Sequence, residues 1–223
     1  MPRKWIDRVG EIITNETLCL AAQDRIRAGC KVLDCTIVIA DPEEVSLHCS
    51  SFVNCTIRVL KKRKHSWDGC CFDSCIFKGT FYDRYFGNDS LDGTCKGCLR
   101  NCDFTGATLN LCAFFNCTPE DLRLPGWPHV TIFYPNKNAK DFADLAVDSV
   151  LGRMDALLTI RDVVALTFDL PAYVRKARPA ILRSWKLEKL LAKTRSEPEP
   201  PEPTFSLENM RKLLQTKPYV FMS

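Results

Sequence analysis

Small and large side chains alternate along residues 30–132 with a period of five. A small residue opens each unit, and a large apolar residue follows two positions later. In the first block the small residues fall on multiples of five, namely Cys30, Cys35, Ala40, Ser50, Cys55, Cys70, Cys75 and Thr80. The large residues are Val32, Ile37, Leu47, Phe52, Ile57, Trp67, Phe72, Phe77 and Tyr82. A second block in another phase contains Cys102-Asp103-Phe104, Ala107-Thr108-Leu109 and Cys112-Ala113-Phe114. The pattern predicts a repeat architecture.

A period of twenty lies on top of the period of five, since Cys35, Cys55 and Cys75 are twenty residues apart. Four units of five therefore predict one square coil, with equivalent residues stacked about 4.8 Å apart on successive coils. An insertion of about seven residues within Asp83–Lys96 would place Leu99 in the Val32 column and Cys102 in the Cys35 column.

The cysteines fit this geometry. The large residue of each unit is expected to fill the coil axis, and the small residue a cramped corner that suits cysteine, a small and soft hydrophobe. Eight of the thirteen cysteines occupy the small position, namely residues 30, 35, 55, 70, 75, 102, 112 and 117. We interpret these eight as packing residues.

The repeat resembles the pentapeptide-repeat family, whose units read roughly Ala-Asp/Asn-Leu-x-x. Cys102-Asp103-Phe104 and Ala107-Thr108-Leu109 match best, and cysteine often replaces the usual alanine. Ala40-Asp41-Pro42 and Leu60-Lys61-Lys62 lack the large residue, so these faces are expected to bulge into loops. The resemblance implies a right-handed quadrilateral β-helix. The expected fold is mainly β, a right-handed β-solenoid of about five coils followed by a C-terminal α-helical appendage.

Four segments are expected along the chain. Residues 1–29 form an N-terminal cap, because unpaired strand edges at the end of a solenoid invite aggregation. Residues 30–134 form the solenoid, with Leu122–Leu124 and Val130–Tyr134 as its last, looser strands. A helical appendage follows over residues 135–195. Residues 196–223 form a proline-rich linker and a terminal helix.

Apolar spacing predicts several helices in the tail. Asn138 is expected to cap a helix that has Gly152 near its end, a second helix covers Asp155–Phe168, and a third starts at Pro179. The third helix is expected to carry a basic stripe opposite apolar side chains. The stripe is Arg183, Lys186, Lys189 and Lys193, and the apolar residues are Ile181, Trp185 and Leu191. Ser206 is expected to cap a final helix that ends before Pro218.

The odd number of cysteines and the charged N-terminus, which lacks an apolar signal segment, predict reduced thiols in the cytoplasm. The sequence contains no run of about 18 apolar residues, so no membrane span is predicted.

Cys95-x-x-Cys98-x-x-x-Cys102 has the spacing of half a zinc site, and Cys71 is expected one coil away from Cys98. Cys71, Cys95 and Cys98 leave open a thiolate metal cluster, or a disulfide between Cys71 and Cys98. Because Cys102 points inward and no histidine flanks the group, we predict neither metal nor cofactor.

No catalytic constellation emerges from the sequence. The three histidines, His48, His65 and His129, form no Cys-His or Ser-His-Asp pattern, and no phosphate-binding glycine loop is present. We therefore predict a non-enzymatic protein.

Two surface segments are the candidate binding sites. Lys61-Lys62-Arg63-Lys64 forms a compact cationic loop. The insertion is expected to expose Arg84, Tyr85, Phe86 and Asp89 on a rigid scaffold, which is a common setting for recognition.

The predicted function is a protein–protein interaction module, such as an immunity or inhibitor protein that occludes a toxin or an enzyme. The family resemblance implies one alternative, a DNA-mimic-like protein that binds topoisomerases, but residues 1–134 carry no net charge. Another alternative is nucleic-acid or anionic-surface binding through the basic loop and the tail stripe. The sequence pI of about 8.4 is low for a dedicated nucleic-acid binder. Oligomeric state is left open.

Overall fold

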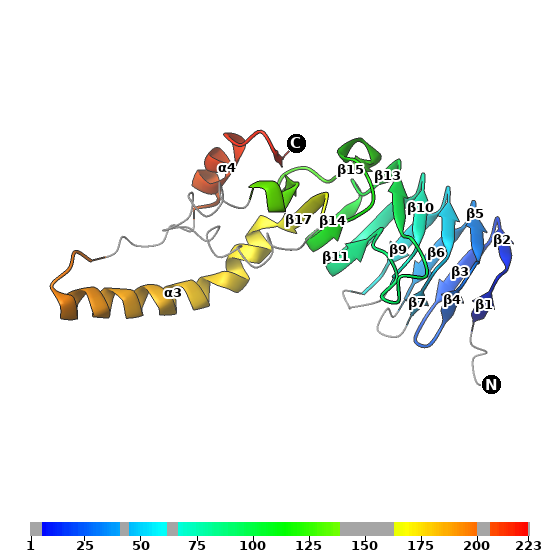
Figure 1. Ribbon diagram of the computed structural model, residues 1–223, viewed down its shortest axis with the longest axis horizontal. Coiled ribbons are helices and arrows are strands. Elements are labelled where there is room, and N and C mark those ends of the chain that lie inside the picture. Colours follow the sequence, from blue (N-terminus) through cyan, green and yellow to red (C-terminus); the bar gives the residue numbers. More distant parts are fainter. Residues whose placement is uncertain (1–5, 41–44, 62–66, 139–162, 200–205, 223) are drawn as a thin grey trace.

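The computed structural model describes residues 6–40, 45–61, 67–138, 163–199 and 206–222. It is a mainly β protein, with 40% of its residues in strands and 21% in helices. A parallel-strand β-solenoid of about five turns holds the N-terminal part, and helices follow it (Figure 1). The predicted fold class is therefore confirmed.

Short strands make up the first part of the chain. They are β1 (Asp7–Val9), β2 (Ile12–Thr14), β3 (Thr17–Leu20), β4 (Arg25–Arg27), β5 (Lys31–Leu33), β6 (Thr36–Ile39), β7 (Ser46–Leu47), β8 (Ser51–Val53), β9 (Thr56–Val59), β10 (Cys71–Asp73) and the longer β11 (Ile76–Phe86). The later elements are β12 (Cys98–Arg100), β13 (Cys102–Asp103), β14 (Ala107–Phe114), a 3-10 helix over Pro119–Asp121, β15 (Leu122–Arg123), β16 (His129–Phe133), β17 (Ala165–Asp169), α3 (Leu170–Arg195), α4 (Leu207–Gln215) and β18 (Val220–Phe221).

The solenoid walls are parallel sheets in which equivalent strands of successive coils pair. One wall runs β2-β5-β8-β10-β12, and another runs β3-β6-β9-β11-β14. Val32 pairs with Phe52, and Phe52 with Phe72, so the coil repeat is 20 residues. Phe72 then pairs with Leu99, 27 residues further on, and this confirms the predicted seven-residue insertion.

The solenoid starts one coil earlier than predicted. Residues 1–29 were expected to form a cap, but β2 pairs in parallel with β5 and β3 with β6, so these strands form a first coil. Its repeat is 19 residues on both walls, as Ile13 pairs with Val32 and Leu18 with Ile37. The change from 20 to 19 shifts the inward positions away from multiples of five, which hides this coil from the repeat pattern.

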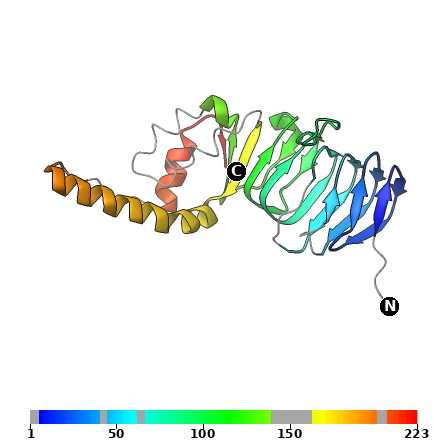
Figure 2. The same ribbon diagram turned by 60° about the horizontal axis from the view of Figure 1, so that its bottom comes forward.

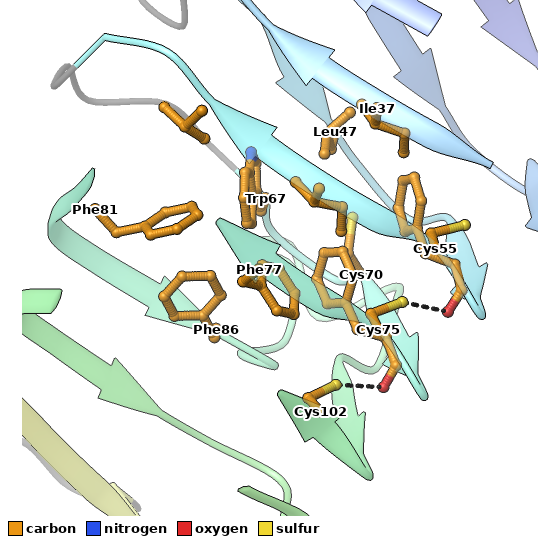
Figure 3. Packing of buried hydrophobic residues seen from close by; sticks show 14 of the residues in the cluster. Ile37, Leu47, Cys55, Trp67, Cys70, Cys75, Phe77, Phe81, Phe86 and Cys102 are labelled. Carbon is orange, nitrogen blue, oxygen red and sulfur yellow. Dashed lines mark hydrogen bonds between the residues drawn. The ribbon is translucent and has the colours of Figure 1, made fainter. Parts of the chain in front are cut away.

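Aromatic rings fill the axis of the later coils. Phe52 stacks on Phe72 with ring centroids 5.0 Å apart, and Phe77 on Phe104 at 4.3 Å. Trp67 lies among Phe77, Phe81 and Phe86, and it is buried (Figure 3). Stacked and edge-to-face pairs of this kind add about 0.5–1.5 kcal/mol each beyond the burial of their area.

Seven of the eight small-position cysteines are buried, and Cys117 is half-buried. Burial raises the pKa of the Cys70 and Cys112 thiols to about 12, so these side chains are neutral at physiological pH. Several of these thiols also contact backbone. Cys75 donates to the carbonyl oxygen of Phe52 at 3.4 Å, and Cys102 to that of Phe72 at 3.5 Å, so the thiols link one coil to the coil before it (Figure 3).

The C-terminal end of the solenoid is covered by antiparallel strands. β17 pairs with β14, the last long solenoid strand, and β16 and β18 extend this sheet outward. The predicted looser strand Val130–Tyr134 therefore exists as β16, but it pairs antiparallel instead of forming another coil. This arrangement leaves the edge of β14 paired, as the end of a solenoid requires.

The predicted tail helices need three corrections. Residues 165–168, expected to be helical, lie in β17, where Ala165 and Leu166 are buried, and residues 155–162 lie outside the described residues. Asn138 does not precede a helix, because residues 135–138 are already helical and its amide donates to the carbonyl oxygen of Phe133. Residues 139–150 lie outside the described part.

The third helix begins nine residues before Pro179. Asp169 caps α3 by accepting a hydrogen bond from the backbone N–H of Ala172 at 2.9 Å, and Pro179 lies inside the helix. The predicted terminal helix is confirmed as α4, with Ser206 as its N-cap. Met210 and Leu214 of α4 pack with Val130 of β16 in a second apolar cluster.

Candidate functional site

The predicted insertion residues do not form one surface. β11 runs on as far as Phe86, so Arg84 and Phe86 lie in the solenoid wall, where both are buried, instead of in an exposed loop. Phe86 packs its ring on Phe114 at 5.4 Å. Tyr85 is 44% exposed, and Asp89 lies in the loop that follows. The prediction was therefore wrong for Arg84 and Phe86, because the strand continues past the left-handed residue Asp83.

Arg84 occupies a small inward position, since it pairs with Cys112 on the next coil. Its side chain is only 6% exposed, and its Nε and Nη2 atoms have no hydrogen-bond partner among the described residues. Burial lowers the pKa of its guanidinium to about 10. Arg84 is thus a desolvated cation within the wall and not a surface anchor.

The seven-residue insertion lies within residues 87–97, which we call the corner loop. The carbonyl oxygen of Asn88 accepts from the N–H of Gly69 at 3.0 Å, and the Asn88 amide donates to Asp68 at 3.0 Å, so the loop starts in register with the preceding coil. Ser90 closes the loop. Its N–H donates to the carbonyl oxygen of Cys95, and its hydroxyl accepts from the N–H of Cys95, both at 2.9 Å.

Two carboxylates fix the loop further. Asp89 accepts from Lys96 at 2.6 Å, from the N–H of Gly97 at 3.2 Å and from Asn116 at 2.8 Å. The hydrogen bond from Lys96 is the main cause of the lowered pKa of Asp89. Asp92 accepts from Ser90 and from Thr94, and these bonds lower its pKa to about 2. Both groups are therefore ionised at neutral pH.

A disulfide between Cys49 and Cys95 anchors the corner loop to the solenoid. Gly69 lies between the two cysteines. A Cβ atom on Gly69 would lie 2.7 Å from the Cβ of Cys95 and 3.3 Å from the sulfur of Cys49. Gly69 also has a φ of +66°, which L-residues with side chains rarely adopt. Glycine at this position therefore gives the loop room to fold back across one coil.

This disulfide corrects the predictions about cysteine chemistry. Cys71 and Cys98 are register partners as expected, but both thiols are free, and burial raises the pKa of Cys71 to about 12. Cys95 is bonded to Cys49 and so is removed from the proposed cluster. In the described part of the chain, no three His, Cys, Asp or Glu side chains are placed to hold a metal ion. Neither Cys49 nor Cys95 occupies a small position of the repeat. This was the signal in the sequence that these two cysteines are not packing residues.

The predicted basic loop is described only at Lys61, which is exposed; Lys62, Arg63 and Lys64 lie outside the described residues. Leu60 lines a shallow groove of 680 Å³ on the outer wall of the solenoid, together with Arg58, Lys78 and Thr56. The groove has two cations of its own, Arg58 and Lys78, and Lys61 follows the lining residue Leu60 in the chain.

The two histidines that the structure describes, His48 and His129, make contacts within the fold. His129 accepts a hydrogen bond from the N–H of Leu109 at 3.1 Å, and burial lowers its pKa. His48 contacts the Cys49 sulfur at 3.8 Å, and His65 lies outside the described residues. His129 therefore joins β16 to β14.

Comparisons with protein-family models, with curated proteins and with solved structures found no match to this chain. The resemblance to pentapeptide-repeat proteins accordingly rests on the repeat pattern and on the parallel solenoid. Among the residues that the structure describes, no helix has both the length and the apolar character needed to cross a bilayer.

Proposed function

We propose that the chain is a non-enzymatic protein-binding module of the pentapeptide-repeat type, and that it acts as an inhibitor or immunity protein. In this proposal the corner loop contacts another protein, such as a toxin or an enzyme, and occludes its working surface. The observation that carries the proposal is Leu91, which is 95% exposed at the tip of a loop fixed by the Cys49–Cys95 disulfide.

A fixed loop favours binding, because the ordering of its backbone is completed before the partner arrives. Ser90, Asp89 and the disulfide hold both sides of Leu91, so its side chain is presented in one place. Tyr85 and Phe115 form an edge-to-face pair at 5.5 Å, and Asn116, the next residue, bonds to Asp89 of the loop. Tyrosine is enriched at binding hot spots, so the half-exposed Tyr85 would supply an aromatic anchor near the loop that presents Leu91.

The test compares proteins captured from a native lysate by the wild-type chain and by Leu91→Asp. We expect one protein to be retained by the wild type and lost by the variant, and its activity to fall when the wild-type chain is added. Ile12→Asp is the matched control, because Ile12 is an exposed aliphatic residue on the first coil, away from the later coils that carry the loop. Identical captured proteins for the wild type and Leu91→Asp would contradict the proposal.

Anion binding is a second candidate function, favoured by the groove that holds Arg58 and Lys78. It predicts an affinity for DNA or RNA that falls as salt rises, because each neutralised phosphate releases counterions. The double variant Arg58→Glu/Lys78→Glu should abolish this affinity, whereas Lys31→Glu on another wall should not. An affinity that is the same at low and high salt, or the same in the wild type and the double variant, would exclude this function.

A further inference from the structure

The long helix α3 extends from the C-terminal end of the solenoid, apart from the corner loop. Its 26 residues make a rod roughly 39 Å long that points away from the solenoid (Figure 1, Figure 2). It contains eight lysine and arginine residues against one glutamate, a net charge of +7. Its first turns are anchored, because Leu170 and Val174 are buried with Phe168 in the second apolar cluster. The far half therefore extends into solvent on a fixed base.

Three leucines on this far half share one face. Leu187, Leu190 and Leu191 are 58%, 64% and 43% exposed, and they are spaced i, i+3, i+4, which places them together on a helix. Arg183, Lys186 and Lys193 are exposed and lie beside them at helical spacing. An apolar patch with a cationic border is thus presented on a projecting helix.

The opposite face of α3 carries Trp185 and Lys189, and Lys189 is paired with a residue that follows the helix. Lys189 lies 5.4 Å from the ring centroid of Trp185 and pairs with Glu199 at 2.7 Å. Lys189 was predicted to lie opposite Trp185, so the structure corrects this detail. Glu199 therefore lies on the Trp185 side of α3, and the three leucines lie on the other side, where they are exposed.

We infer that α3 inserts Leu187, Leu190 and Leu191 into an apolar groove of a second protein whose rim is acidic. Anchors at i, i+3 and i+4 are how amphipathic helices dock in such grooves. The charge of +7 selects carboxylates around the groove and opposes a second copy of α3. A bilayer fits less well, because the leucines span only about 6 Å of the helix axis, whereas interfacial helices are apolar along their length. The inference does not depend on the corner loop.

Calcium-loaded calmodulin is a suitable probe, because it is acidic and its methionine-rich groove is open with calcium and closed without it. Labelled calmodulin is titrated with the full chain, and the bound fraction is followed by fluorescence anisotropy. We expect calcium-dependent binding that weakens at least about tenfold in Leu187→Asp/Leu190→Asp/Leu191→Asp. Arg183→Glu/Lys186→Glu/Lys193→Glu should weaken binding and reduce its salt dependence.

Ile12→Asp is the matched control, because Ile12 is an exposed aliphatic residue in the first coil with no role in either proposal, and it should bind calmodulin as the wild type does. Circular dichroism checks that each variant folds. The inference is overturned by absence of calcium-dependent binding or by equal affinities of the wild type and the leucine variant. It is also overturned by binding to phosphatidylserine vesicles but not to calmodulin, or by dimers that need the three leucines.

Discussion

The thiol of Cys75 lies 3.4 Å from the carbonyl oxygen of Phe52, on the coil before it. Cys55 has the same relation to Val32, and Cys102 to Phe72. An alanine at these positions would leave the carbonyl without this contact and leave space at the corner. The thiols therefore fill volume and join successive coils at the same time, which accounts for cysteine in the small position.

Replacing Cys75 by alanine should destabilise the fold by about 1–2 kcal/mol, from the cavity and the lost hydrogen bond. Urea unfolding followed by circular dichroism measures the change. Cys19→Ala is the control, because Cys19 is exposed, and it should stay within about 0.5 kcal/mol of the wild type. Equal stability of Cys75→Ala and the wild type would show that the contact between the Cys75 thiol and the Phe52 carbonyl does not stabilise the fold.

Gly69→Ala should destabilise the protein more than Gly10→Ala. Both glycines have a φ of +66°, but a Cβ at Gly10 meets no atom within 4 Å, whereas one at Gly69 would lie 2.7 Å from the Cβ of Cys95. The difference between the variants isolates the crowding under the disulfide, which we expect to be about 1–3 kcal/mol. If the two variants unfold at the same urea concentration, Gly69 is not the spacer for the corner loop.

The Cys49–Cys95 disulfide should leave eleven free thiols among the thirteen cysteines. Alkylation of the unfolded, non-reduced protein followed by mass spectrometry counts them. The bond spans 46 residues, so its reduction should lower the free energy of unfolding by about 2–4 kcal/mol.

Cys71→Ser/Cys98→Ser is the control for the disulfide, since both thiols are free and should leave this loss unchanged. Disulfides are rare in a reducing cytoplasm, so the predicted cytoplasmic location stays a prediction that the same count tests in protein isolated from cells. Thirteen alkylated cysteines in purified protein would show that the bond does not form.

The repeat pattern predicted the solenoid because inward positions depend on local spacing. Phe52 and Phe72 fall in one column at the regular spacing, and Leu99 continues this column after the seven-residue insertion. The corner loop was less predictable, because the pairing of Cys49 with Cys95 depends on how an insertion folds back over Gly69. Arg84 was misplaced for a related reason. It was assigned to the exposed insertion because the five-residue pattern stops before Asp83, whereas β11 continues through Arg84 to Phe86.

The corner loop should lose stability in acid. The Asp92 pKa of about 2 lies below the value of about 3.9 for an unfolded aspartate, so its ionised form stabilises the fold above pH ~4. This contribution is lost as pH falls toward about 2. Asp92→Asn should therefore melt at a lower temperature than the wild type at neutral pH, and the gap should close between pH ~4 and pH ~2.

Thr94→Ala removes one donor to Asp92 and should move the closing of this gap to higher pH, because the pKa of Asp92 rises. Differential scanning calorimetry at several pH values measures both effects. A gap between Asp92→Asn and the wild type that stays constant down to pH ~2 would show that the carboxylate is not held as described.

Arg84→Met should stabilise the protein. The guanidinium is buried, and two of its nitrogens lack hydrogen-bond partners in the described part of the chain. Methionine keeps a similar length without the desolvation of a charge, so the expected gain is about 1–3 kcal/mol in urea unfolding. Arg100→Met is the control, because Arg100 is exposed, and it should change stability by less than about 0.5 kcal/mol. Destabilisation by Arg84→Met with no change in Arg100→Met would mean that the Arg84 charge is compensated in the folded protein.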